Sequence, residues 1–199
     1  MAGTFNKTEH VPFDFAAANK RFSDHKYPAP NPVVGDRSRT GIVCCSDPRC
    51  TPEVFFKLRF QEAFCVRNEG GRTADPSVIR TISLIDALGS TVNEKIEEIM
   101  VVHHTDCSAL VYDDQTLLDI IVKNDPNAPG GPWKKGAESY AEAIGSLPFP
   151  PGTTERERLE QSVKDDVEFL VHHPMWKPKV RVTGWIYDLE TGKVEQIQV

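Results

Sequence analysis

Cysteine, histidine and charged residues gather in two short stretches of the chain. Cys45 is followed by Asp47 and Arg49, and His104 is followed by Cys107. Two thiolates and one imidazole suit the borderline-soft ion Zn²⁺, and three protein ligands leave a fourth position open, as in catalytic zinc sites. A bound zinc ion lowers the pKa of water towards ~7 and so supplies hydroxide at neutral pH. The two stretches together predict a catalytic centre with one Zn²⁺ per chain.

The charged residues of the first stretch suit a role beside such a metal. Asp47 can accept a hydrogen bond from the hydroxide and orient it, while Arg49 keeps the Asp47 carboxylate ionised. The alternative for this pair is a salt bridge in a loop, which contributes little to stability. The alternative for Cys45 is a buried apolar thiol, but this would not explain the charged residues that follow it at once.

Short apolar runs place both stretches at the ends of strands. Sites in parallel sheets collect beyond the carboxyl ends of the strands, where Cys45, Arg67 and His104 all fall. Strands that alternate with helices imply a parallel sheet with helices on both faces. The strands are expected at 40–45, 63–66, 99–102, 179–187 and 193–199. The helices are expected at 13–22, 53–59, 75–89, 110–121 and 155–173.

The last two strands predict a hairpin at the sheet edge, so the fold class is α/β. We expect a mixed sheet with parallel core strands and an antiparallel edge strand, flanked by helices. The 199 residues fit one domain, with an N-terminal arm at 1–39 and a Pro-rich excursion at 124–154. A modest helical stretch at 138–144 lies within this excursion.

Composition limits the partners of the protein. A net charge of −6 and a pI near 5.5 argue against nucleic acid and anionic membranes. No apolar run approaches the roughly 20 residues that span a bilayer, and the first 18 residues do not resemble a secretory signal. We therefore expect a cytoplasmic protein. Five cysteines, three of them within seven residues, favour metal binding over a disulfide framework.

The motifs resemble those of the β-class carbonic anhydrases. The matches are Cys-x-Asp-x-Arg from Cys45, His-x-x-Cys from His104, Arg-Asn-x-Gly-Gly from Arg67, the helix opening at Asp75 and Gly-x-x-Tyr-Asp from Gly184. The similarity covers roughly 40–123 and 163–199 and is greatest to a short-chain branch that includes carbonyl sulfide hydrolases.

This resemblance implies roles for individual residues. It makes Cys45, His104 and Cys107 the zinc ligands, and Asp47 and Arg49 a dyad in which the arginine holds the aspartate off the metal. If Arg49 released it, Asp47 could bind zinc and close the site. The substrate is expected beside Ser108, Gly70 and Gly71. The family assembles as homodimers, often paired into homotetramers.

Two departures from the family pattern bear on the substrate. Ser108 stands where the family usually has glycine, and no glutamine lies upstream of Cys45 to donate a hydrogen bond to an oxygen of the substrate. Because sulfur is a weak acceptor, these departures narrowly favour carbonyl sulfide over CO2, with carbon disulfide as a third substrate. The alternative from another class is a non-catalytic zinc protein closed by Asp47, but Arg49 speaks against it.

The remaining reactive residue types favour structural roles. Side chains alternate along a strand, so His103 points away from His104 and Cys44 away from Cys45. His172 and His173 fall at a helix end, where cations interact favourably with the helix dipole. Cys50 could lie near the metal, but its position at the start of a helix gives no clear ligand geometry, and Cys65 lies within an apolar strand. Packing or interface roles are expected for Trp133, Trp176 and Trp185.

Overall fold

The computed structural model describes residues 14–24, 39–59, 62–91, 95–124, 149–175 and 180–199. Two units are described separately, residues 1–34 and residues 35–199. In the first unit, α1 (Phe15–Asp24) begins after Asp14, whose Oδ1 accepts a hydrogen bond from the Ala17 N–H at 2.9 Å. The expected helix at 138–144 and the side chains of Trp133 and Trp176 lie outside the described residues.

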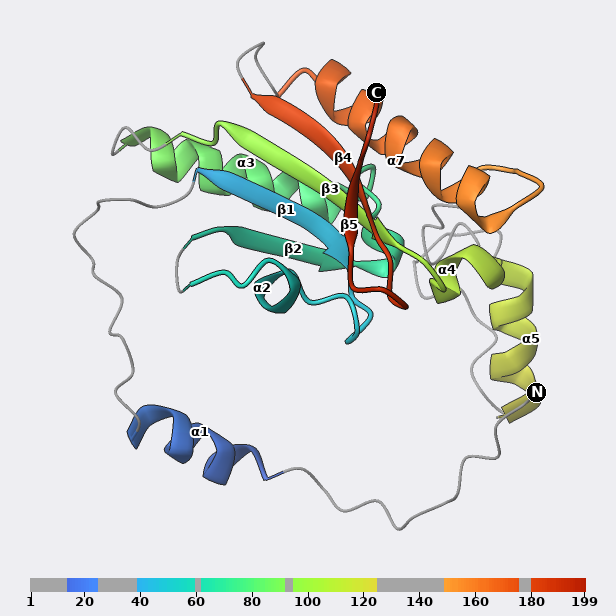
Figure 1. Cartoon of the computed structure of the whole chain (residues 1–199), viewed down its shortest axis with the longest axis horizontal. Helices are drawn as coiled ribbons and strands as arrows, with labels where there is room; N and C mark the ends of the chain where they lie inside the picture. Colours follow the sequence, from blue (N-terminus) through green and yellow to red (C-terminus); the bar gives the residue numbers. More distant parts are fainter. Residues whose placement is uncertain (1–13, 25–38, 60–61, 92–94, 125–148, 176–179) are drawn as a thin grey trace, which may run out of the picture. The chain divides into compact units, whose positions relative to one another are not determined.

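A five-stranded sheet forms the centre of the second unit, in the order β2-β1-β3-β4-β5 (Figure 1). The first four strands pair in parallel, and β5 pairs antiparallel with β4 at the edge. This confirms the predicted mixed sheet. The strands are β1 (Thr40–Cys45), β2 (Phe64–Asn68), β3 (Glu98–His104), β4 (Arg181–Tyr187) and β5 (Val194–Ile197).

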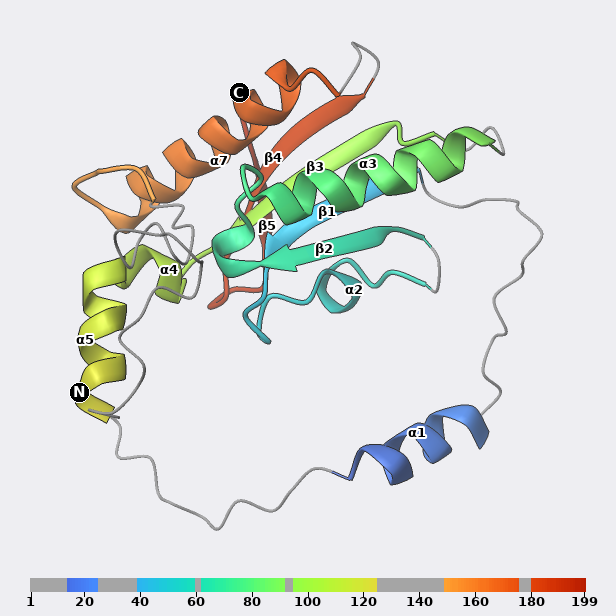
Figure 2. The same ribbon diagram turned by 180° about the vertical axis from the view of Figure 1, so that it is seen from behind.

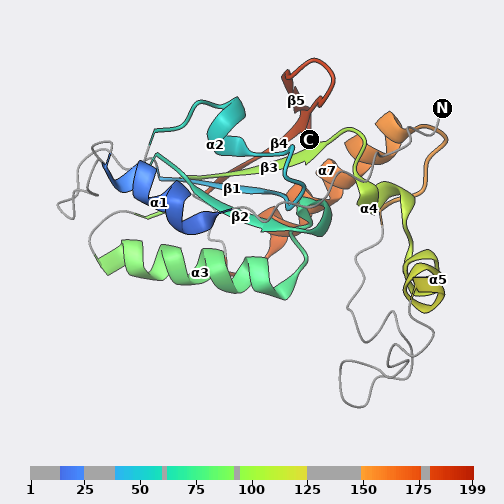
Figure 3. The same ribbon diagram turned by 90° about the horizontal axis from the view of Figure 1, so that it is seen from below.

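Helices cover both faces of the sheet, as predicted. Figure 3 shows α2 on one side of the strands and α3 on the other, and Figure 2 shows α7 running alongside β4. The close packing of α7 depends on Gly184, because a Cβ there would lie 2.3 Å from Val163 Cγ1. The helices of this unit are α2 (Pro52–Phe55), η1 (Glu69–Gly71), α3 (Pro76–Thr91), α4 (Ser108–Val111), α5 (Asp114–Asn124) and α7 (Glu155–His172).

Three predicted helix boundaries were wrong. The single helix expected at 110–121 is two, because Tyr112 is extended and Asp113 Oδ1 accepts a hydrogen bond from Thr116 N–H at 2.8 Å, which starts α5 afresh. The helix expected at 53–59 ends at Phe55, two residues before Lys57, whose φ of 52° is left-handed. Gly89 does not stop α3, which continues to Thr91.

Aliphatic side chains between the sheet and its helices make the core. The largest fully buried ones come from β1, β3, β4, α3 and α7, and each contributes about 1.5–3 kcal/mol by leaving water. A capping box between Thr154 and Glu157 fixes the start of α7. Among the described residues, no helix is long and apolar enough to cross a membrane. The core aliphatics include Ile42, Val43, Val78, Ile82, Ile99, Val101, Leu159, Leu170 and Ile186.

Candidate metal centre and active site

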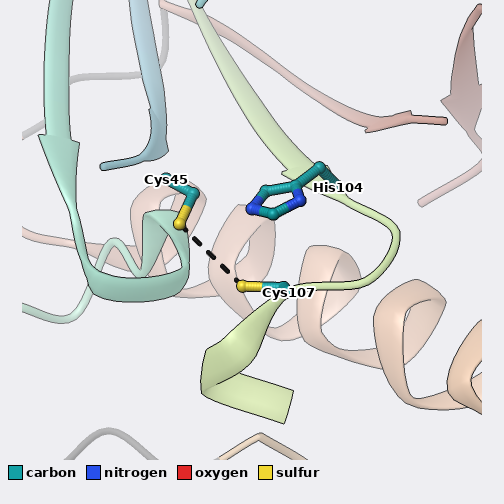
Figure 4. Close-up of side chains that lie close together, drawn as sticks. All are labelled: Cys45, His104 and Cys107. Carbon is teal, nitrogen blue, oxygen red and sulfur yellow. Dashed lines mark hydrogen bonds between the residues drawn. The ribbon is translucent and has the colours of Figure 1, made fainter. Parts of the chain in front are cut away.

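Three buried side chains converge where β1 and β3 end (Figure 4). Cys45 is the last residue of β1, His104 is the last residue of β3, and Cys107 lies directly before α4. Their ligand atoms all lie within 4.8 Å of one another, and the two sulfur atoms are 3.9 Å apart. Two sulfurs bound at about 2.3 Å to a tetrahedral zinc ion would lie about 3.8 Å apart. The spacing therefore fits Zn²⁺.

The hydrogen bonding of His104 prepares it to bind a metal. Its Nδ1 lies 2.8 Å from the carbonyl oxygen of Thr105, which can only accept, so Nδ1 carries the proton. Nε2 then presents a lone pair, and this buried atom has no hydrogen-bond partner among the described residues. A buried nitrogen without a partner is unfavourable unless something else occupies it, and a metal ion does so.

The sulfur of Cys45 lies where negative charge is favoured. Contact with Cys107 lowers the pKa of Cys45 to about 4; burial opposes this shift, whereas His104 and the N–H groups of Asp47 and Gly70 support it. The Asp47 N–H donates to Cys45 Sγ at 3.4 Å. The same sulfur–sulfur contact raises the pKa of Cys107. The two sulfurs thus share one proton, and a zinc ion would displace it because a coordinating thiol is deprotonated.

A turn formed by two glycines packs against the backbone at Cys45. Gly70 and Gly71 have φ values of 69° and 71°, in the left-handed region that favours glycine. A Cβ on Gly71 would lie 3.0–3.1 Å from backbone atoms of Cys44 and Cys45, and a Cβ on Gly70 would lie 2.7 Å from the ring of Phe149. These glycines let the turn approach β1 closely enough for its N–H to face the sulfur.

Arg67 fixes the loop that follows Cys45. Its Nε donates to the carbonyl oxygen of Cys45 at 3.0 Å, and its Nη2 donates to the carbonyl oxygens of Asp47 at 2.7 Å and Cys50 at 2.8 Å. One side chain therefore satisfies three backbone acceptors across the loop that carries the Asp47–Arg49 pair.

Asp47 and Arg49 form the ion pair that the sequence predicted. Arg49 Nη2 lies 2.7 Å from Asp47 Oδ2, and its Nε lies 3.1 Å from Oδ1. The guanidinium lowers the pKa of Asp47 to about 2, although desolvation opposes the shift. The Asp47 oxygens are not among the converging ligand atoms. In this geometry the Asp47 carboxylate is paired with Arg49 and lies outside the converging Cys-His-Cys group.

A second carboxylate on Arg49 was not anticipated. Arg49 Nη1 donates to Asp106 Oδ2 at 2.7 Å, and its Nη2 donates to the Asp106 carbonyl oxygen at 3.1 Å. Asp106 has a φ of 54°, and its N–H donates to Glu155 Oε1. The sequence could have pointed to Asp106 because this residue lies within the His104–Cys107 motif. Asp106 thus links the two ligand-bearing loops through Arg49.

A buried polar network behind the ligands was also missed. Asp166 on α7 accepts a hydrogen bond from Arg72 Nε at 2.7 Å and lies 3.2 Å from His103 Nε2. The sequence could have pointed to Asp166, because its carboxylate falls on the apolar face of a helix, between Val163 and Leu170. His103 faces α7 and not the metal, which confirms the alternation expected along β3.

The other reactive residues take up structural positions. Cys44 and Cys50 are buried, and Cys65 is half-buried in β2. His172 ends α7, and its Nδ1 lies 2.9 Å from the Glu168 carbonyl oxygen. The indole N–H of Trp185 donates to Thr183 Oγ1 at 2.9 Å.

The sheet and the Cys-His-Cys group at its strand ends define a zinc-dependent enzyme of the lyase and hydrolase type. The family model for carbonic anhydrase matches residues 40–194, and the chain belongs to the β-carbonic anhydrase family. This confirms the family, the fold and the zinc cofactor expected from the sequence.

Relatives within this family carry two kinds of name. Beta-carbonic anhydrase 1 of Mycobacterium tuberculosis is 25% identical over 92% of this chain and 96% of its own length. A carbon disulfide hydrolase of Acidianus is 26% identical over 89% of this chain and 85% of its own length. Among solved structures, a carbonic anhydrase from Glaciozyma antarctica has a TM-score of 0.67 at 27% identity, covering 92% of this chain and 95% of its own.

Proposed function

We propose that Cys45, His104 and Cys107 hold one zinc ion and that the enzyme hydrolyses carbonyl sulfide. One molecule of carbonyl sulfide and one of water would give CO2 and hydrogen sulfide. The observation that carries the metal assignment is the buried, unpartnered Nε2 of His104 beside two sulfurs 3.9 Å apart. When bound, zinc lowers the pKa of water and so supplies hydroxide at neutral pH.

Asp47 and Arg49 orient the attacking group in this proposal. The pKa of Asp47, lowered to about 2 by Arg49, keeps its carboxylate ionised at neutral pH. An ionised carboxylate can only accept, so it fixes the proton of the nucleophile and leaves the nucleophilic lone pair facing the substrate carbon. Arg49, held by Asp106 as well, prevents Asp47 from turning to the metal.

The choice of carbonyl sulfide rests on groups that bind oxygen. No glutamine precedes Cys45, and Ser108 follows Cys107 at the first position of α4, where the family usually has glycine. Both features remove or alter hydrogen-bond donors that would suit an oxygen atom of the substrate. A sulfur atom depends less on such donors because it is a weak acceptor. The similarity to a carbon disulfide hydrolase supports sulfur-containing substrates for this chain, with carbon disulfide itself as a further substrate.

The second candidate is hydration of CO2 to bicarbonate. It is favoured by a relative named Beta-carbonic anhydrase 1, whose identity of 25% is close to that of the carbon disulfide hydrolase, and by the Asp47–Arg49 pair itself. CO2 and carbonyl sulfide are both linear and apolar, so a narrow pocket separates them only through how it receives the sulfur atom.

We also propose that the protein acts in the cytoplasm as a homodimer or homotetramer. Large apolar side chains that are more than half exposed support an assembly, because a single chain leaves them in water. Those on α3 and α4 are Leu84, Leu88 and Val111, and others lie elsewhere in the described residues, such as Val54 on α2 and Val171 on α7. Light scattering coupled to size exclusion would give the number of chains, and a monomer at working concentration would contradict this assembly.

The substrate is tested by measuring kcat/KM for carbonyl sulfide and CO2 side by side. We expect at least a tenfold preference for carbonyl sulfide, which corresponds to about 1.4 kcal/mol of transition-state stabilisation. Ser108→Gly should shift the ratio towards CO2, whereas Ser90→Gly, on the exposed surface of α3, should not.

Rapid CO2 hydration with negligible release of hydrogen sulfide would overturn the assignment and leave a carbonic anhydrase. A protein with stoichiometric zinc and no turnover of CO2, carbonyl sulfide or carbon disulfide would instead indicate the non-catalytic alternative.

A further inference from the structure

One carboxylate on α7 contacts both segments that position the proposed zinc ligands. The Asp166 side chain is 2% exposed, and its Oδ2 lies 2.7 Å from Arg72 Nε and 3.2 Å from His103 Nε2. His103 directly precedes His104 in β3, and Arg72 directly follows the Gly70–Gly71 turn. The His104 strand and the turn beneath Cys45 therefore meet at a single side chain.

Further hydrogen bonds fix the orientation of this carboxylate. The N–H and hydroxyl of Thr73 lie 3.1 Å and 3.0 Å from Asp166 Oδ1, and the same hydroxyl lies 2.9 Å from the Asp166 carbonyl oxygen. His103 is held from its other side, because its Nδ1 lies 2.7 Å from Ser162 Oγ, one turn earlier on α7. Both carboxylate oxygens thus have hydrogen-bond partners, while the imidazole ring of His103 is hydrogen-bonded at Nδ1 and faces the carboxylate at ion-pair distance with Nε2.

The turn held by Arg72 bears directly on the proposed ligand Cys45. Gly71 packs against the backbone of Cys44 and Cys45, because a Cβ on it would lie only 3.0–3.1 Å from their backbone atoms. A displacement of Arg72 would move this turn relative to the Cys45 sulfur. A displacement of His103 would turn the end of β3, and with it the lone pair of His104 Nε2.

We propose that Asp166 is a positioning residue of the zinc site, which sets the placement of Cys45 against His104 by holding Arg72 and His103 on one carboxylate. The proposal rests on the ligand set given under the proposed function. Removing the carboxylate charge would break the buried ion pair between Asp166 and Arg72, and breaking a buried pair by removing one partner is strongly unfavourable. The Arg72 side chain would then shift and carry the Gly70–Gly71 turn with it.

The test compares Asp166→Asn with the wild-type chain in two metal-binding measurements. Zinc affinity is measured by competition with a chromophoric chelator, and ligand geometry is measured from the thiolate-to-metal charge-transfer bands of the Co²⁺-substituted protein. Loss of groups that orient metal ligands costs about 10- to 100-fold in affinity or activity, so we expect at least a tenfold weaker zinc affinity and shifted cobalt bands. Glu168→Gln, an exposed position with the same charge change on the same helix, should match the wild type.

Turnover of the zinc-loaded variant gives an independent readout. We expect kcat to fall while KM stays nearly unchanged, because Asp166 is 2% exposed and touches protein groups behind the ligands. If Asp166→Asn does not fold, Thr73→Val removes one hydroxyl donor to the same carboxylate without changing charge, and should shift the bands in the same direction.

Two results separate the possible failures. A folded Asp166→Asn or Thr73→Val variant with wild-type zinc affinity and unchanged cobalt bands would overturn the positioning role and leave the ligand set standing. A wild-type protein whose cobalt form shows no thiolate-to-metal bands would overturn the ligand set, and the positioning role with it.

Discussion

Two carboxylate–guanidinium pairs flank the metal site, one exposed and one buried. In the first pair the Arg49 side chain is 50% exposed and also binds Asp106, while the Asp47 side chain is 13% exposed. In the second pair the side chains of Arg72 and Asp166 are 10% and 2% exposed. Exposed ion pairs contribute about 0.2–1 kcal/mol, but removing one partner of a buried pair costs about 3–5 kcal/mol.

This difference in environment separates two roles for the same chemical groups. Because breaking the Asp47–Arg49 pair should cost little stability, we expect that Asp47 can exchange Arg49 for the metal, and that the pair would then govern whether the site is open. Breaking the Arg72–Asp166 pair would cost much more stability, so this pair suits a fixed structural role beneath the ligand-bearing segments. We infer that the exposed pair controls activity and the buried pair controls the frame that carries the ligands.

The largest expected effect is on stability, at the buried pair. Asp166→Asn should lower the free energy of unfolding by about 3–5 kcal/mol, because it breaks the buried ion pair with Arg72. Asp47→Asn should lower it by less than about 1 kcal/mol, because Arg49 can be solvated. Urea unfolding at one fixed free zinc concentration compares the two, and equal losses would remove the contrast between the pairs.

The next effect is on activity, at the exposed pair. Asp47→Ala should keep its zinc and lose about 100-fold in kcat/KM, because positioned acid–base groups contribute about 10²- to 10⁴-fold. The measurement pairs metal analysis with turnover on carbonyl sulfide and CO2. An Asp47→Ala enzyme with full activity would show that the carboxylate does not orient the nucleophile.

Arg49→Ala tests the switch itself, with a smaller expected loss of about tenfold, or 1.4 kcal/mol. Without the guanidinium, Asp47 is free to turn and bind the metal, so a crystal structure of the zinc form should show a fourth protein ligand. An open metal site together with full activity in this variant would contradict the role given to Arg49.

The ligand group was predictable because its sequence signal is local. Cys45 and His104 each end a short apolar run, and neighbouring parallel strands bring such ends together. The position of Cys107 followed from its three-residue spacing to His104. The parallel pairing of the first four strands and the antiparallel edge strand were predicted in a similar way from the apolar patterns of strands and helices. Each of these patterns can be recognised within a single segment of the sequence.

The buried network was not predictable because its members lie far apart in the chain. Asp166 and Arg72 are 94 residues apart, and no local pattern relates them. The carboxylate on the apolar face of α7 marked an unusual buried charge, but its partner appears only after α7 packs on the sheet. Helix boundaries such as the break at Tyr112 depended on a side-chain cap from Asp113.

The smallest expected effect is the pH dependence of the exposed pair. The pKa of Asp47 is lowered from its ordinary 3.8 to about 2, so its stabilising contribution is full above about pH 4 and is lost as the pH falls towards 2. The difference in unfolding free energy between metal-free wild type and Asp47→Asn should therefore be constant above pH 4 and shrink below it. A difference that grew on acidification would have the wrong sign for a pair formed by the ionised carboxylate.

Metal analysis of the wild type and of Cys107→Ser tests the central claim most directly, namely that Cys45, His104 and Cys107 hold a single catalytic zinc ion. The wild-type protein should contain about one zinc per chain, and Cys107→Ser should lose most of it because one of only three protein ligands is gone. Cys65→Ser, at a half-buried cysteine in β2, is the matched control and should keep its zinc. Stoichiometric zinc in folded Cys107→Ser, or none in the wild type, would contradict the ligand assignment.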